Sequence, residues 1–149
     1  MEVKVDIEIE KSKQNVWSAI TNIENYSDMI SEIMRLNVIE RPAEGLVGIK
    51  WKETRMMFGK EASEVMWITE AVENEYYCTR AESHGSVYVT KLSLEKTDNG
   101  TILTMIFKAT AQSFIIKIIS VLMGVMIKGS MKKALKKDLE DIKEFVEKQ

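Results

Sequence analysis

A continuous helical pattern fills the C-terminal part of this 149-residue sequence, from residue 113 to residue 147. Its first half, 114–127, is apolar on almost every side and is interrupted only by Lys117, Ser120 and Gly124. A helix that is apolar all round must be covered on more than one side. The second half is an ordinary amphipathic helix with the apolar stripe Met131, Leu135, Leu139, Ile142 and Val146. The chain before this helix must therefore supply a surface that surrounds it.

This helix is too long to lie straight inside a domain of this size. About 34 residues at about 1.5 Å each span roughly 50 Å, whereas the radius of gyration of such a domain is only about 15 Å. We therefore expect the helix to bend, near Gly124 or Gly129-Ser130, or to project beyond the rest of the molecule.

Alternating apolar and polar residues before the helix indicate β-strands. The predicted strands are 3–9, 33–39, 47–58, 61–72, 76–82, 86–95 and 101–111. Ser12 is a good N-cap for a first helix that continues to about residue 23, and a second short helix is expected at 25–29. Asn99-Gly100 is a hairpin signal because these residues accept the positive φ that tight turns need. Successive hairpins imply an antiparallel sheet.

The order of elements predicts an α+β fold in a single domain, residues 1–149. Two short helices follow the first strand, and a curved antiparallel sheet of about seven strands wraps around the long C-terminal helix. Such an arrangement can leave a cavity between the sheet and the helix. The sequence has one proline and seven glycines and shows no linker or repeat that would divide it.

Composition and charge narrow the class of protein. A hydrophobic fraction of 45% and a charged fraction of 30% are typical of a soluble globular protein. A net charge of −2 argues against a nucleic-acid binder. The chain opens on a strand pattern rather than a signal peptide, which favours a cytoplasmic location. The apolar run from Phe114 contains Lys117 and falls short of the roughly 20 residues that a transmembrane helix needs.

Three stretches resemble the START-like (Bet v 1-like, SRPBCC) superfamily. Residues 16–26 (VWSAITNIENY) look like its opening helix pair, 48–55 (GIKWKETR) with 59–61 (GKE) like its third and fourth strands, and 126–139 like its final helix. The likeness covers the whole chain and is greatest to the polyketide cyclase/dehydrase and lipid-transport group. It implies the helix-grip fold and a small hydrophobic ligand. The iron sites of the oxygenase members have no counterpart here, because one His and one Cys cannot supply them, and no metal or other cofactor is expected.

The strand at 47–58 carries the most suggestive polar pair. Alternation along this strand directs Glu53 and Arg55 to the same inward face as Ile49, Trp51 and Met57. Within an apolar pocket the pair could orient a carboxylate, hydroxyl or carbonyl group of a ligand. The alternative is a partly buried ion pair that fixes the strands, with Glu61 or Glu64 as a further partner.

Further ligand-binding candidates come from neighbouring elements. On the strand at 61–72 we favour Trp67 as the inward residue. On the strand at 86–95, Tyr88 and Thr90 could offer hydroxyl groups to a ligand, or bond to backbone or water instead. The remaining predicted lining is apolar: Met105, Phe107, Ile118, Leu122 and Met126. The methionines among them can adapt to an irregular ligand or simply fill the core.

A basic band follows on the last helix, at Lys128, Lys132, Lys133, Lys136 and Lys137. Acidic residues follow at once, so this face could be solvated and paired with itself. Beside an apolar segment it could also form a basic collar that docks on an anionic membrane.

Three functions remain open. The first is binding or transport of a small hydrophobic or amphipathic molecule, such as a lipid, a polyketide-like aromatic or an isoprenoid. The second is a cyclase, dehydratase or isomerase, with Glu53 as the base and Arg55 or Tyr88 stabilising an enolate. A carboxylate base needs a raised pKa, whereas a neighbouring Arg55 would lower the pKa of Glu53. The third is an interaction module, with transient membrane contact or a homodimer through the 114–127 helix.

Overall fold

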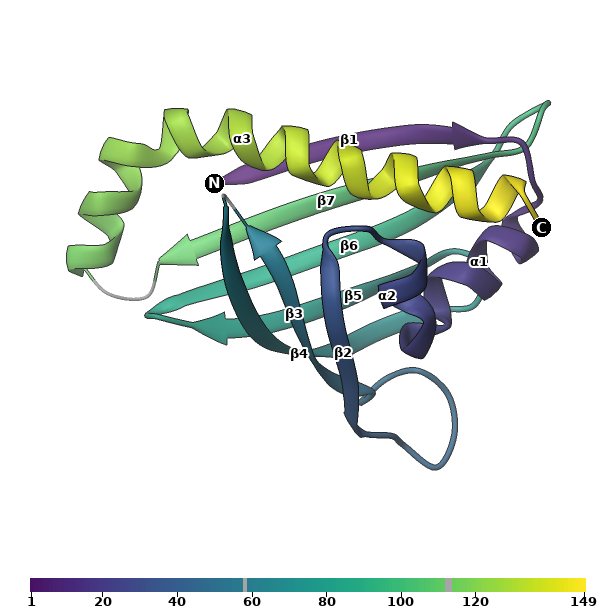
Figure 1. Ribbon diagram of the computed structural model, residues 1–149, viewed down its shortest axis with the longest axis horizontal. Helices are drawn as coiled ribbons and strands as arrows, with labels where there is room; N and C mark the ends of the chain where they lie inside the picture. Colours follow the sequence, from purple (N-terminus) through teal and green to yellow (C-terminus); the bar gives the residue numbers. More distant parts are fainter. Residues whose placement is uncertain (58, 112–113) are drawn as a thin grey trace.

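A long helix lies across one face of a seven-stranded antiparallel sheet in the computed structural model of this chain (Figure 1). The structure describes residues 1–57, 59–111 and 114–149, with side chains for all of these except 114–126. The elements are β1 (Glu2–Ile9), α1 (Lys13–Thr21), η1 (Ile23–Asn25), α2 (Tyr26–Met29), β2 (Ile33–Glu40), β3 (Lys50–Met57), β4 (Lys60–Val72), β5 (Tyr76–Ser83), β6 (Ser86–Lys96), β7 (Thr101–Ala111) and α3 (Phe114–Glu147).

The strand order of the sheet is β1-β7-β6-β5-β4-β3-β2. Strands β2 to β7 are joined as consecutive antiparallel neighbours, as the turn signals predict, whereas β1 pairs with β7. The predicted start of β3 at residue 47 is wrong, since the strand begins at Lys50. Gly48 has a φ of +99°, which is outside the extended region, and this delays the strand.

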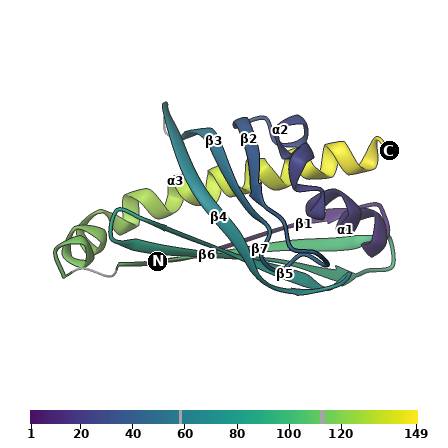
Figure 2. The same ribbon diagram turned by 90° about the horizontal axis from the view of Figure 1, so that it is seen from below.

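The sheet curves around α3, and Figure 2 shows β2, β3 and β4 rising along one side of the helix. The helix itself packs on β1 and β7. Figure 1 shows that α3 bends within its first half, so its N-terminal turns lie at an angle to the remainder. The predicted bend is therefore confirmed, and the predicted α+β arrangement with it.

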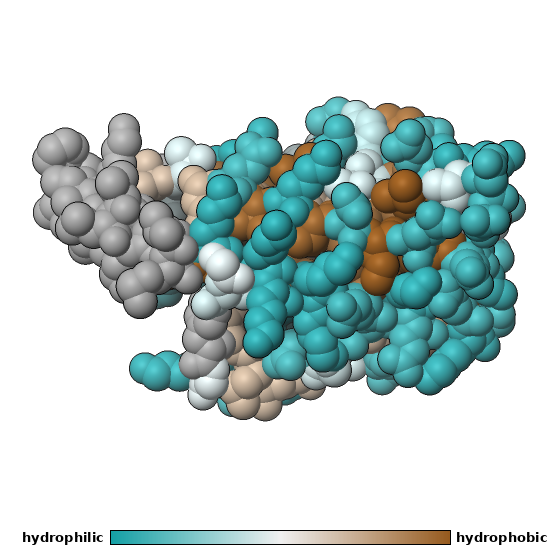
Figure 3. Space-filling view, turned by 90° about the horizontal axis from the view of Figure 1, so that it is seen from above, coloured by the Kyte–Doolittle hydropathy of each residue, from teal (hydrophilic) through white to brown (hydrophobic). Residues whose placement is uncertain are grey.

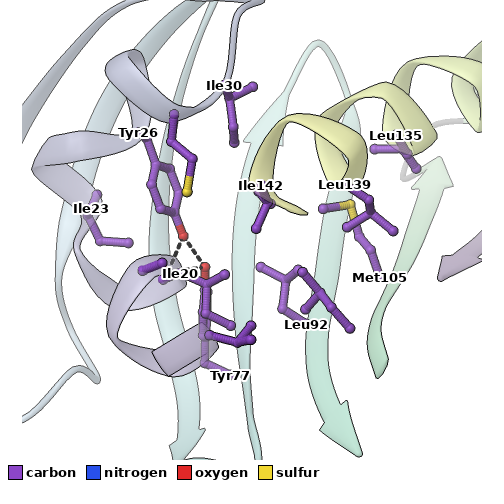
Figure 4. Close-up of a cluster of buried hydrophobic side chains, with 14 of the residues drawn as sticks. Ile20, Ile23, Tyr26, Ile30, Tyr77, Leu92, Met105, Leu135, Leu139 and Ile142 are labelled. Atoms are coloured by element: carbon purple, nitrogen blue, oxygen red, sulfur yellow. Dashed lines mark hydrogen bonds between the residues drawn. The ribbon is translucent and has the colours of Figure 1, made fainter. Parts of the chain in front are cut away.

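The core lies between the concave face of the sheet and the helices. Ser12 caps α1 by accepting a hydrogen bond from the backbone N–H of Asn15. The buried residues of this helix are Val16, Trp17, Ala19 and Ile20. Figure 4 shows Leu92 and Met105 of the sheet facing α3. The predicted stripe on α3 is buried throughout: Met131, Leu135, Leu139, Ile142 and Val146.

The turn at Asn99-Gly100 forms as predicted, but for a different reason. Neither residue has a positive φ. Instead, a Cβ atom on Gly100 would lie 2.1 Å from the backbone oxygen of Ile9. Glycine is therefore required here by the close approach of the end of β1.

Hydrophilic residues cover most of the coloured surface around α3 and β1, with a strip of hydrophobic residues between them (Figure 3). Four lysines of the predicted basic band, Lys128, Lys132, Lys133 and Lys137, are exposed, whereas Lys136 is half-buried and donates to the backbone oxygen of Asp6. Lys137 pairs with Asp141 at 2.7 Å, as the i,i+4 spacing predicts. None of the helices in the described part of the chain has the length and hydropathy needed to cross a membrane.

Candidate functional site

A cavity of about 790 Å³ lies between the concave face of the sheet and α3. Its volume is in the range of small-molecule sites, about 300–1,000 Å³. Strands β3 to β7 supply one wall, and Tyr26 and Ile30 close it from the side of α2. The opposite wall belongs to α3, which contributes Ile127, Met131, Leu135, Asp138 and Ile142.

Strand β3 presents its predicted inward face to this cavity. Trp51, Glu53, Arg55 and Met57 all line it. The pairing of β3 with β4 runs without a shift from Lys50 opposite Trp67 to Met57 opposite Lys60. No bulge interrupts these pairs, so the period-two alternation holds along the whole strand.

Glu53, Arg55 and Asp138 form a buried polar cluster on the cavity wall. The Nε of Arg55 donates to Oε2 of Glu53 at 3.2 Å, and its Nη1 and Nη2 each donate to Oδ2 of Asp138 at 3.1 Å. The indole Nε1 of Trp51 donates to the other Glu53 oxygen, Oε1, at 3.1 Å. The cluster thus joins β3 to α3, and it binds together two residues that sequence analysis singled out and one that it missed.

The third member of the polar cluster, Asp138, is 3% exposed and lies where the sequence suggested a solvated face. Its position was readable from the apolar stripe, because 135, 138 and 142 follow one another at the helical spacing of three and four residues. Burial raises the pKa of Asp138 from its ordinary 3.8 to about 6, although the Arg55 guanidinium opposes this shift. Its second oxygen, Oδ1, is buried and has no hydrogen-bond partner among the described residues.

Each of the three nitrogens of the Arg55 guanidinium donates one hydrogen bond to one of the two carboxylates. Burial by itself would lower the pKa of Arg55, but the charges of Asp138 and Glu53 outweigh it, and the pKa is raised. The predicted further partners of this pair, Glu61 and Glu64, are both wrong. Glu61 pairs instead with Arg35 at 2.6 Å, while Glu64 faces the cavity opposite Glu53.

Strands β6 and β7 bring their predicted residues together. Tyr88, Thr90, Met105 and Phe107 all line the cavity. The rings of Tyr88 and Phe107 are stacked, with centroids 5.8 Å apart and planes 18° apart. Neither the Tyr88 nor the Thr90 hydroxyl has a hydrogen-bond partner in the described part of the chain.

Trp67 does not lie in the cavity, and the prediction that it points inward is wrong. It pairs with Lys50 on the outer face of the sheet, and the Lys50 ammonium lies 5.7 Å from its ring centroid. Met66 takes the inward position, opposite Trp51. On the outer face the indole ring of Trp67 contacts the Lys50 ammonium, and such a cation–π contact is favourable for a half-buried tryptophan.

Two tyrosines that sequence analysis missed stand at the end of the cavity nearest α1 and α2. The hydroxyl groups of Tyr26 and Tyr77 contact each other, and both reach the backbone oxygen of Ile20 (Figure 4). Burial raises the pKa of both phenols well above the ordinary value of 10.0. The pair therefore remains neutral and closes this end with satisfied hydroxyl groups.

The side chains of three predicted ligand-binding residues, Ile118, Leu122 and Met126, lie outside the described part of the structure. The 114–127 helix was expected to meet a membrane or a second copy, and of its surface only the side chain of Ile127 is described. Among the described residues, no group of three or more His, Cys, Asp or Glu side chains is arranged to hold a metal ion.

Comparison with solved structures shows what architecture this cavity belongs to. A START superfamily protein from Mycobacterium smegmatis superposes with a TM-score of 0.82 at 16% identity, covering 99% of this chain and 97% of that one. The chain has the START-like helix-grip fold. TTHA0849 from Thermus thermophilus has the same fold, with a TM-score of 0.81 at 16% identity over 98% of this chain and 97% of that one.

A third structural neighbour is the di-domain ARO/CYC StfQ from the steffimycin biosynthetic pathway. It superposes with a TM-score of 0.81 at 12% identity, covering 99% of this chain and 51% of that one. Identities this low show the fold alone. No known family model and no curated protein matches this chain.

Proposed function

We propose that this protein binds a small hydrophobic or amphipathic molecule in the cavity between the sheet and α3, as a carrier or receptor and not as an enzyme. The observation that carries this proposal is the cavity itself, about 790 Å³ of space lined mainly by apolar and aromatic side chains around one buried polar cluster. Transfer of an apolar tail from water into such a space is favourable by about 0.8 kcal/mol per CH₂ group.

The hydrogen bonds of the polar cluster favour ligand binding over proton transfer by Glu53. A general base needs a carboxylate oxygen within reach of a substrate proton and a pKa near the working pH. Both oxygens of Glu53 already accept hydrogen bonds, one from Trp51 and one from Arg55. The predicted enzyme alternative based on Glu53 and Arg55 is therefore the weaker of the two functions.

The first experiment is native mass spectrometry of the purified protein, followed by extraction and identification of any bound molecule. The protein freed of lipid is then titrated with diphenylhexatriene, a hydrocarbon probe without polar groups. We expect saturable binding at about one probe per chain. No co-purified molecule together with no saturable binding of the probe would overturn the proposal.

A matched pair of substitutions tests whether the probe enters this cavity. Thr90→Phe adds a ring inside the cavity, whereas Thr104→Phe adds the same ring on the outer face, since Thr104 alternates with the inward Leu103 and Met105 of β7. We expect Thr90→Phe to weaken probe binding by about tenfold or more and Thr104→Phe to leave it unchanged. Equal binding by both variants would place the probe elsewhere.

A further inference from the structure

The charged side chains facing the cavity are unbalanced in sign. Among the described lining residues the carboxylates are Glu53, Glu64 and Asp138, whereas the only guanidinium or ammonium side chain is that of Arg55. Arg55 already directs its Nε to Glu53 and both terminal nitrogens to Asp138. The lining also includes Met1, whose terminal ammonium is exposed and donates to a backbone oxygen of β7. Among the described lining residues, negatively charged side chains therefore outnumber positively charged ones by three to one.

One acceptor in this cluster lacks a donor. Oδ1 of Asp138 is buried and has no hydrogen-bond partner among the described residues, although Asp138 lines the cavity. A buried carboxylate oxygen without a donor is costly, and the cost disappears when a donor is supplied. The cavity is where a bound molecule could bring one.

A second carboxylate extends the same character along the wall. Glu64 lies directly opposite Glu53 in the pairing of β3 with β4, is half-buried, and forms no ion pair with any described residue. A ligand carboxylate near these groups would meet like charges in a poorly solvated space, which is strongly unfavourable. A hydroxyl or ammonium group would meet acceptors instead.

We propose that the cavity selects amphipathic molecules whose polar end donates hydrogen bonds, as a hydroxyl or ammonium group, and discriminates against molecules that end in a carboxylate. Asp138 is the residue that receives the donor, with Glu64 adding negative charge to the same space. This inference rests on the proposed function, since it names the chemical class of the molecule that the cavity would take.

The test compares three ligands with the same dodecyl tail, 1-dodecanol, dodecylamine and dodecanoate, as competitors of diphenylhexatriene at neutral pH. Dodecylamine and dodecanoate are the decisive pair, because both carry one charge of opposite sign on the same tail. We expect dodecylamine to bind at least about tenfold more tightly than dodecanoate. Dodecanol should also bind more tightly than dodecanoate. Equal binding of the amine and the carboxylate, or tighter binding of the carboxylate, would overturn the inference.

Asp138→Asn isolates the role of the unpaired oxygen. We expect this variant to lower the ratio of amine to carboxylate affinity by about tenfold. Asp141→Asn is the matched control, because it makes the same change on α3 at a residue that bonds to Ser31 and Lys137 and is absent from the described cavity lining. A ratio that Asp138→Asn leaves unchanged would overturn the assignment of Asp138.

Two further outcomes keep the proposals separate. If diphenylhexatriene binds but the carboxylate is preferred, the inference fails and the proposed function stands. If no ligand and no probe bind, the proposed function fails. Should Asp138→Asn not fold, Glu64→Gln provides the same comparison from β4, and the ranking of the three ligands on the unsubstituted protein still decides.

Discussion

Arg55 on β3 donates from both terminal nitrogens to a single oxygen of Asp138 on α3, and the two residues are 83 positions apart in the sequence. This contact fastens the sheet to the helix across the cavity wall. It is largely buried, with the Arg55 side chain 18% exposed and that of Asp138 5% exposed. In such a pair the loss of one partner leaves the other charge buried without compensation.

Replacement of Arg55 by Met should destabilise the protein strongly. The change leaves Glu53 and Asp138 as two buried carboxylates without a cation, and the expected loss is about 3–5 kcal/mol in the free energy of unfolding. Urea unfolding followed by tryptophan fluorescence measures it. Arg35→Met is the control, since the Arg35–Glu61 pair is exposed and should contribute at most about 1 kcal/mol. Similar losses in the two variants would contradict this account of the cluster.

The stability of the protein should depend on pH through Asp138. Because burial raises its pKa from 3.8 to about 6, the folded protein holds this proton more tightly than the unfolded chain does. The contribution of Asp138 is therefore fully present below about pH 4 and is lost as the pH rises through about 6, by roughly 3 kcal/mol. The difference in unfolding free energy between the unsubstituted protein and Asp138→Asn, measured over this range, should fall accordingly.

Asp141 provides a control of opposite sign. Burial alone would raise the pKa of Asp141, but hydrogen bonds from Lys137 and Ser31 outweigh it, and the pKa is lowered. The stability that Asp141 contributes should therefore be lost as the pH falls, and the same difference measured with Asp141→Asn should rise with pH. Parallel pH profiles for the two variants would show that the environment of Asp138 is not the one described.

Neighbouring tyrosines should respond differently to loss of the hydroxyl group. Tyr77→Phe removes a buried hydroxyl that contacts Tyr26 and the backbone oxygen of Ile20, and we expect a loss of about 1–3 kcal/mol in the free energy of unfolding. Tyr76→Phe removes one that reaches the exposed Glu70, and the loss should stay within about 0.5 kcal/mol. Chemical unfolding compares the two, and a larger effect at Tyr76 would contradict the assignment.

Two glycines should respond to alanine with opposite signs. Gly129 lies within α3 with open space around the position of a Cβ atom, so Gly129→Ala should stabilise the protein by about 0.5–1 kcal/mol. At Gly100 a Cβ atom would strike the backbone of Ile9, so Gly100→Ala should destabilise it. Thermal unfolding measures both changes in stability. A stabilising Gly100→Ala would show that the turn can accommodate a Cβ atom, contrary to the structure.

The fold was predictable because its signals are local. Alternation defines each strand, turn residues separate them, and the bounds of β7 at 101–111 agree with the structure at both ends. Alternation also placed Glu53 and Arg55 on one face. Asp138 was missed because it follows a run of lysines that suggests a solvated surface, although its spacing from Leu135 and Ile142 places it on the buried stripe. Its ion pair with Arg55 was not predictable, because the partner belongs to a distant strand.

The orientation of β4 shows a second limit of the sequence. An aromatic ring is expected inside on grounds of hydrophobicity, which favoured Trp67, but residues paired directly across a hairpin share a face. The pairing of Met57 with Lys60 fixes Trp51 opposite Met66 and sends Trp67 outward. Tertiary pairing decided this position, not the character of the side chain.

The placement of β1 and β2 at opposite ends of the sheet has a consequence for the order of folding. Strands β2 to β7 can zip from short hairpins, whereas the pairing of Glu2 with Lys108 must close a loop of about one hundred residues, and such closures are slow. We therefore expect pulse-labelling hydrogen exchange to protect the amides of β4 to β6 before those of β1. Because α3 packs on β1, the cavity would then form last during folding. A ligand could therefore stabilise the folded protein but could not assist the earlier folding steps.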